Sequence, residues 1–161
     1  KDLPLITAPQ EVNETLDDGF LSVMTFAGPF SFSENLNYTP LKHIAQVINE
    51  QQPEFVILGG PFVDINHPQV GEGELFYRDE EGKVNCFEDK NIYVAIRDYL
   101  DKAVQGANTQ VVIIPSLSDM YSEFPFPQPP LSDKNTENVT FLSNPSRFSI
   151  NGVEFGVLNT E

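Results

Sequence analysis

Three short apolar runs, each closed by glycine or proline, constrain the fold of this chain more than any other feature. They cover residues 21–27, 55–58 and 111–114, and they are followed by Gly28-Pro29, by Gly59-Gly60-Pro61 and by Pro115. Continuous apolar runs of about four to eight residues between turn signals are typical of strands that are buried on both faces. We therefore predict three core strands that end in tight loops.

Helical patterns separate these strands. Thr39 and Pro40 provide a helix cap and a first-turn proline, apolar residues recur at helical spacing through residue 48, and Pro53 ends the pattern. A second apolar stripe runs from residue 92 to residue 104 and stops at Gly106, where a left-handed cap fits. This alternation predicts an α/β fold with a mainly parallel sheet. In such a sheet the loops after the strands, residues 28–30, 59–64 and 115–119, are the natural place for chemistry.

The outer parts of the chain differ from its centre. Residues 1–18 carry prolines and acids without periodicity, so we expect a linker from an upstream region, followed by one domain over residues 19–161. Residues 65–88 are polar and acidic and predict a long surface excursion. Asn151-Gly152 between two apolar segments predicts a β-hairpin. The chain stops soon after this hairpin without a closing helix, so we expect a domain that is truncated at its C-terminal end.

The Pro/Phe segment, residues 124–130 with the sequence FPFPQPP, is incompatible with a helix or a central strand. Exposed aromatic residues beside prolines form preordered contact surfaces. The same residues can instead form a packed, irregular connection across the edge of the sheet. The sequence leaves both interpretations open.

The charge balance narrows the possible functions. The 161 residues include 24 acidic and 9 basic residues, a net charge of −15, which disfavours direct binding to nucleic-acid phosphates. No run approaches the roughly 18 to 20 apolar residues that cross a bilayer, so we expect no membrane segment. The single Cys86 excludes an internal disulfide and a multi-cysteine metal site. Asn-x-Ser/Thr tripeptides at Asn13, Asn37 and Asn138 leave a secreted glycoprotein as an alternative.

The order and closure of the three loops resemble those of calcineurin-like metallophosphoesterases. That family carries acids, histidines and an asparagine in these loops, and the residues hold two metal ions that activate water. In this chain Phe30, Pro61 and Leu117 stand where the family has metal ligands. Proline, phenylalanine and leucine cannot coordinate a hard dication. We therefore expect a degenerate calcineurin-like phosphoesterase fold, layered α/β/β/α and present in part, with no catalytic residue, no metal ligand and no cofactor. The degenerate former-site positions are Gly28, Phe30, Pro61, Asp64, Ser116 and Leu117.

Asp64, Asp119 and His67 keep a divergent metal-dependent phosphohydrolase open as an alternative function. Asp64 and His67 are close in sequence, but two ligands do not make a metal site. His43, in the first predicted helix, has no second ligand at metal spacing. For both histidines we expect a surface or structural position.

The chain also carries an ordered set of short motifs that are weak singly and specific together. They are Gly28-Pro29-Phe30, Tyr38-Thr39-Pro40-Leu41, Gly60-Pro61-Phe62-Val63-Asp64 with His67, Ile114-Pro115-Ser116-Leu117-Ser118-Asp119, Phe126-Pro127-Gln128-Pro129-Pro130 and Phe141-Leu142-Ser143-Asn144-Pro145. In this order, over about residues 20–160, the motifs resemble the B, or regulatory, subunits of DNA polymerase alpha–primase.

This resemblance implies a noncatalytic subunit whose inactive phosphoesterase domain packs with an OB-fold domain. The OB-fold lies outside these residues, which agrees with a linker at residues 1–18. The resemblance also implies that the domain holds the zinc-bearing C-terminal region of the polymerase catalytic subunit, and primase indirectly, during the initiation of DNA replication in the nucleus. The residues that contact the partner stay unknown.

Overall fold

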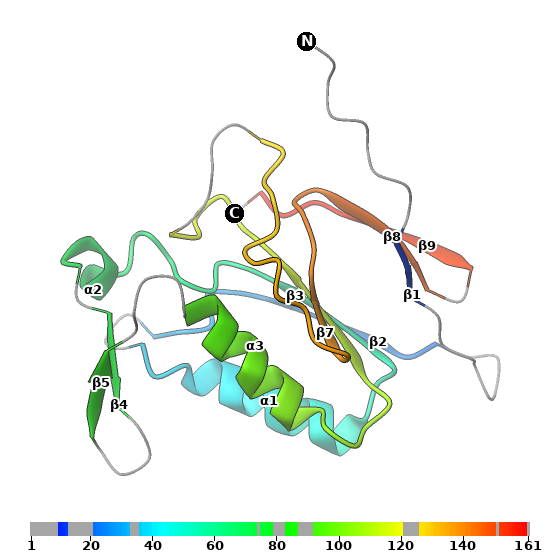
Figure 1. Ribbon diagram of the computed structural model, residues 1–161, viewed down its shortest axis with the longest axis horizontal. Helices are drawn as coiled ribbons and strands as arrows, with labels where there is room; N and C mark the ends of the chain where they lie inside the picture. The colour runs from blue at the N-terminus through cyan, green and yellow to red at the C-terminus, as the bar shows by residue number, and fades with distance from the viewer. Residues whose placement is uncertain are drawn as a thin grey trace.

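The centre of the fold is a parallel four-stranded sheet (Figure 1). The computed structural model describes residues 10–12, 21–32, 36–73, 75–78, 83–86, 92–120, 126–150 and 152–160. The strand order is β2-β3-β6-β7, and every neighbouring pair is parallel. The three predicted strands are thus confirmed, and β7 is a fourth that the sequence did not reveal. The bounds are β2 (Val23–Ala27), β3 (Phe55–Gly59), β6 (Gln110–Ile114) and β7 (Val139–Phe141).

Helices α1 (Thr39–Gln51) and α3 (Ile92–Ala103) cover one face of this sheet (Figure 1). Both predicted helices are confirmed, and Gly106 has the left-handed φ of 88° that the predicted cap requires. The start of α1 differs from the prediction. Tyr38, with a φ of 53° and no side-chain cap bond, occupies the N-cap position, and Thr39 is the first helical residue. Burial of the Tyr38 ring in the core overrides the local capping preference of threonine.

A second sheet covers the opposite face, at the right of Figure 1. It consists of β1 (Gln10–Val12), β8 (Ser146–Ile150) and β9 (Val153–Val157), in the order β1-β8-β9. Strands β8 and β9 form the predicted antiparallel hairpin, with Gly152 at a φ of 79° in the turn. Asn151 lies outside the described residues. The described chain therefore has three layers, α/β/β.

Alternate residues of the central strands divide the core between the two faces. On β3, Val56 and Leu58 pack with the helices, whereas Phe55 and Ile57 pack with the second sheet. Strand β6 divides in the same way. Residues 55–58 and 111–114 are apolar throughout because a strand covered on both faces has no solvent side.

Residues 65–88 contain more structure than the predicted surface excursion. They include the short helix α2 (Pro68–Gly71) and an antiparallel ribbon of β4 (Phe76–Arg78) and β5 (Val84–Cys86), at the left of Figure 1. The acids at 79–81 lie outside the described residues. Within the described ranges, no helix has the length and hydrophobicity that a membrane crossing requires.

Candidate functional site at the strand ends

The three predicted loops meet at the carboxyl ends of β2, β3 and β6. The Gly28 amide donates to the Gly59 carbonyl at 2.8 Å, and the Gly60 amide donates to the Ile114 carbonyl at 2.9 Å. Asp64 and Asp119 pair as an isolated antiparallel bridge. The sequence prediction that these loops lie together is confirmed.

Asp119 is the central polar residue of this site. Its Oδ1 accepts hydrogen bonds from the amides of Phe62 at 2.7 Å and Val63 at 3.0 Å, and its Oδ2 accepts from the Ser116 amide at 2.9 Å. The side chain has 0% exposure. Burial raises the pKa of Asp119 to about 6, against the lowering effect of these three amide bonds, and the negative charge of Asp64 adds a smaller increase. The carboxylate joins the second loop to the third.

Two glycines allow this close approach. A Cβ atom at Gly60 would lie 2.2 Å from Asp119 Oδ2, and one at Gly28 would lie 2.4 Å from the Pro61 carbonyl oxygen. Neither distance is possible for a real side chain. The first two loops therefore pack backbone against backbone, and any residue other than glycine at position 60 displaces the carboxylate.

Further amide side chains join the site from distant parts of the chain. Gln128 Nε2 donates to the Ser116 carbonyl at 2.9 Å, and Asn144 Nδ2 donates to Gln128 Oε1 at 2.8 Å. The backbone amide of Asn159 donates to Asn144 Oδ1 at 3.0 Å, and the side-chain Nδ2 of Asn159 donates to the Gly60 carbonyl at 3.0 Å. We call Asp119, Gln128, Asn144 and Asn159 the strand-end cluster.

The predicted former-site positions contribute packing more than polar chemistry. The rings of Phe30 and Phe62 lie 4.9 Å apart, and Phe30 and Pro61 are buried. Ser116 is also buried, and its Oγ accepts from the Ser118 amide at 3.0 Å. Gly28 and Leu117 are partly buried. Aromatic rings and backbone carbonyls thus fill the space between the loops.

These side chains do not fit a pair of metal ions. Asp64 is the only acid among the six former-site positions, and its Oδ1 accepts from the backbone and side-chain amides of Asn66 at 2.8 and 3.1 Å. Both oxygens of Asp119 are occupied by backbone amides. Throughout the ranges that the structure describes, no three His, Cys, Asp or Glu side chains group closely enough to hold a metal ion.

His67 offers no free ring nitrogen to a ligand site, and His43 lies elsewhere, on α1. His67 is buried, and its Nδ1 accepts from the Gln69 amide at 3.2 Å, so the proton is on Nε2, which donates to the Phe32 carbonyl at 2.9 Å. His67 therefore caps α2 and ties it to the first loop. His43 is exposed on α1, as the sequence predicts.

The sequence analysis missed Gln128, Asn144 and Asn159 as site residues. One signal could have found the first of them: Gln128 is the single side chain in the Pro/Phe segment that can both donate and accept hydrogen bonds. Asn144 and Asn159 carried no comparable signal, since their role depends on contacts with remote residues.

The fold and the site define an α/β domain whose strand-end loops are closed by hydrogen bonds among its own groups. The family of DNA polymerase alpha/epsilon B subunits matches residues 23–161, and the chain belongs to this family. The resemblance drawn from the ordered motifs is confirmed.

Several curated relatives are named as B subunits of DNA polymerase alpha. The chain is 33% identical over 144 residues to the protein of Mus musculus, covering 86% of this chain and 22% of the relative. It is 30% identical over 157 residues to the Bos taurus protein, covering 94% of this chain and 24% of the relative. It is 29% identical over 158 residues to that of Saccharomyces cerevisiae, covering 94% of this chain and 22% of the relative. The chain therefore spans about a fifth to a quarter of the length of these relatives.

Proposed function

We propose that this chain is a noncatalytic part of the B subunit of DNA polymerase alpha–primase, folded as an inactive calcineurin-like phosphoesterase domain. The observation that carries the proposal is the strand-end cluster. Where a phosphoesterase needs open metal ligands, this chain has a carboxylate that accepts hydrogen bonds from three backbone amides. Buried aromatic rings lie beside it. An enzyme site needs a space for substrate and groups free to act on it.

The proposed role is to hold a partner protein. We propose the zinc-bearing C-terminal region of the polymerase catalytic subunit as the direct partner and primase as an indirect one, in the initiation of nuclear DNA replication. Residues 1–18 would contain the linker from an OB-fold region, although Gln10–Val12 within them pair with β8 as β1. Residues 19–161 would be the N-terminal and central part of the inactive domain. The names of the relatives support membership of this polymerase complex. The role uses no cofactor.

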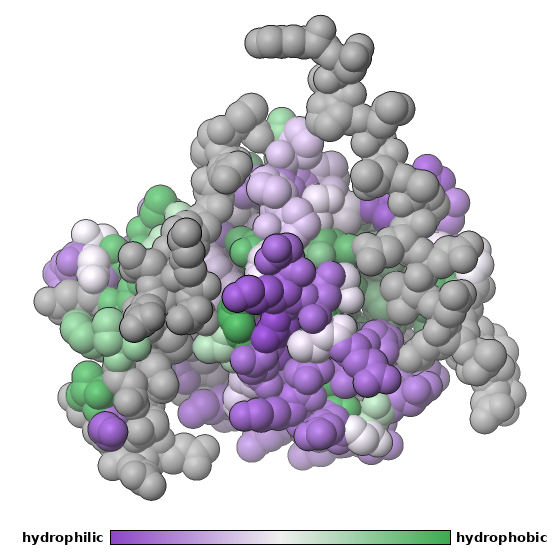
Figure 2. Space-filling view, viewed as in Figure 1, coloured by the Kyte–Doolittle hydropathy of each residue, from purple (hydrophilic) through white to green (hydrophobic). Residues whose placement is uncertain are grey.

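Exposed apolar side chains just beyond the strand-end loops and in the Pro/Phe segment are the candidates for partner contact. Phe32 is 48% exposed, Ile65 is 51% exposed, and Phe126 in the Pro/Phe segment is 44% exposed. Large aromatic and aliphatic side chains contribute most of the binding energy at protein interfaces. The face over α3 and residues 132–138, in contrast, is hydrophilic (Figure 2).

A co-purification experiment tests the partner. The full-length B subunit should bind the C-terminal region of the catalytic subunit, and Phe126→Asp or Ile65→Asp should weaken binding about tenfold or more, because an interface anchor commonly contributes at least 2 kcal/mol. Val153→Asp is the matched control, since Val153 is 53% exposed on β9, away from these loops. Failure of the intact protein to bind would overturn the proposed partner.

A metal analysis tests the absence of catalysis. Purified full-length protein should contain no stoichiometric metal and should not hydrolyse a generic phosphodiester in manganese. Stoichiometric metal together with turnover that is lost in Asp64→Ala would establish the alternative, a divergent phosphohydrolase. Intact-mass measurement tests the glycoprotein alternative, for which Asn138 is poorly placed because its Nδ2 donates to Asp101 Oδ1 at 3.3 Å. Asn13 lies outside the described residues.

A further inference from the structure

The strand-end cluster connects segments that are far apart in the sequence. Gln128 lies in the Pro/Phe segment, Asn144 follows β7, Asn159 follows β9, and Asp119 lies in the loop after β6. The link from Asn159 Nδ2 to the Gly60 carbonyl spans 99 residues. One continuous set of hydrogen bonds therefore joins the loops of the main sheet to the end of the second sheet.

Most of the cluster is buried, and its polar groups are matched. Asp119, Gln128 and Asn144 have exposures of 1% or less, and Asn159 is partly buried. The Gln128 side chain both donates and accepts, and so does that of Asn144. A buried polar group without a partner costs about 1 to 3 kcal/mol, so loss of one member leaves its neighbours unsatisfied. A buried set of polar groups that are all hydrogen-bonded favours one conformation over the alternatives.

The Pro/Phe segment depends on this cluster more than an ordinary loop would. Pro127, Pro129 and Pro130 have no amide hydrogen, so Gln128 provides the only backbone donor between residues 127 and 130. That donor bonds the Asn144 carbonyl at 2.7 Å, and the Asn144 amide returns a bond to the Gln128 carbonyl at 3.0 Å. A single residue thus fixes the described part of the segment, residues 126–130, through its backbone and its side chain. Phe124 and Pro125 lie outside the described residues.

We infer that the strand-end cluster is an internal clamp that sets the conformation of residues 126–130 of the Pro/Phe segment against the strand ends without a metal ion. Gln128 is buried, whereas the residues on either side of it, Phe126-Pro127 and Pro129-Pro130, are exposed. The clamp therefore presents these four residues as a preformed surface. Binding to such a surface loses little conformational entropy. The inference rests on the proposed function only in treating the strand ends as a site that holds no metal.

Hydrogen exchange measured by mass spectrometry on the full-length protein tests the clamp. Asn144→Asp removes the amide donor that bonds Gln128 Oε1 and the Asn159 carbonyl and places a carboxylate oxygen there instead. We expect exchange to rise at least tenfold in peptides containing Gln128, Asn159 and residues 60–63 together, while α1 keeps its protection. Asn135→Asp is the matched control, because Asn135 is exposed and its retained Oδ1 is the atom that bonds the Phe141 amide.

If Asn144→Asp unfolds the protein, Gln128→Glu provides a milder variant. It removes the bond from Nε2 to the Ser116 carbonyl and should raise exchange in the same peptides by a smaller factor. Faster exchange confined to the substituted segment, or no change in either variant, would overturn the clamp.

A metal titration completes the test. Protection of these peptides should be equal in EDTA and in added Mn²⁺, and a manganese-dependent increase in protection would overturn a metal-free clamp. The result is separable from the proposed function, because loss of partner binding with protection intact would refute the proposed partner and leave the clamp standing.

Discussion

Asp119 is an acid that backbone amides solvate in place of water. Burial of its side chain raises its pKa from the ordinary 3.8 to about 6. A carboxyl whose pKa is higher in the folded than in the unfolded state stabilises the fold most when it is protonated. The contribution of Asp119 is therefore fully present below pH 3.8 and is lost as the pH rises through about 6.

This direction of the pH dependence of stability leads to a prediction for Asp119→Asn. Asparagine does not titrate, so the stability of the wild type relative to this variant should fall by up to about 3 kcal/mol between pH 4 and pH 7, at about 1.4 kcal/mol per pKa unit. Chemical denaturation of both proteins across this range measures the difference. A difference that is constant with pH would show that the pKa of Asp119 is not raised.

Gly60 supports a second prediction at the scale of one residue. Gly60→Ala should lower the free energy of unfolding by about 1 to 3 kcal/mol, because the added Cβ overlaps Asp119 Oδ2. Gly156→Ala is the control, since nothing lies within 4 Å of a Cβ at Gly156. Comparable thermal midpoints for the two variants would contradict the close packing at the strand ends.

The sequence predicts which loops form the site, because each loop follows an apolar strand and begins with glycine or proline. That Pro61 and Phe30 stand in place of metal ligands is implied by the resemblance to phosphoesterases and stays a prediction. What fills the site was not visible. Asn159 reaches Gly60 across 99 residues, and no local pattern encodes such a contact.

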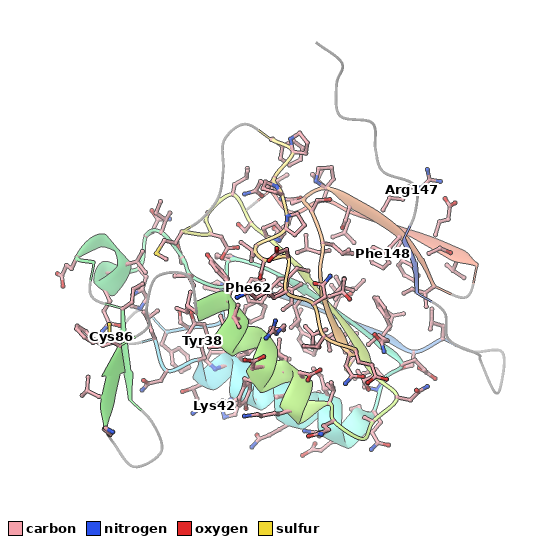
Figure 3. All side chains as sticks on the ribbon, viewed as in Figure 1. Tyr38, Lys42, Phe62, Cys86, Arg147 and Phe148 are labelled. Carbon is pink, nitrogen blue, oxygen red and sulfur yellow. The ribbon has the colours of Figure 1, made fainter. Side chains whose placement is uncertain are left out.

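At the scale of elements, Tyr38 connects the helical layer to the site. Its hydroxyl donates to the Phe62 carbonyl at 2.9 Å, and the two residues lie side by side in Figure 3. Burial raises the pKa of Tyr38 further above its ordinary range, so its hydroxyl stays protonated and remains a donor. The start of α1 is therefore fixed to the second strand-end loop.

Phe148 supports a prediction about the second sheet. Its ring centroid lies 5.6 Å from that of Phe55 in the main sheet and 5.6 Å from that of Phe155 in β9. Phe148→Ala should cost about 3 to 5 kcal/mol and should raise hydrogen exchange in β8 and β9 more than in α1. Arg147→Ala should cost less than about 1 kcal/mol, because its ion pair with Glu154 is exposed. Equal exchange in both layers would contradict two separate core clusters.

The elements predicted from the sequence are those with strong local periodicity. The helices and the three core strands contain enough apolar residues to define a period, and the hairpin has a specific turn signal. Strands β1, β4, β5 and β7 have three residues each, and the sequence analysis missed all four. Their structure comes from pairing with partners, as when Val139 pairs with Val111, and not from local preference.

At the scale of the whole molecule, the net charge of −15 predicts that this chain makes no direct contact with nucleic acid. In a polymerase complex assembled on primed DNA, we predict that ultraviolet cross-linking will recover no DNA-linked peptides from residues 23–160. Acidic surfaces repel phosphate and release no counterions on contact with it. Cross-linked peptides from a protein of the complex that binds the template serve as the positive control, and cross-links to the strand-end loops would contradict the prediction.

The packing of Gly60 against Asp119 also bears on how this chain can evolve. A lineage that acquired a metal centre here would have to free the carboxylate from three amides and rebuild neighbouring loops as well. Each early step would lose stability before any activity appeared, in a class of molecules whose total stability is only about 5 to 15 kcal/mol. The closed packing at the strand ends therefore makes a stepwise gain of a metal centre costly in stability.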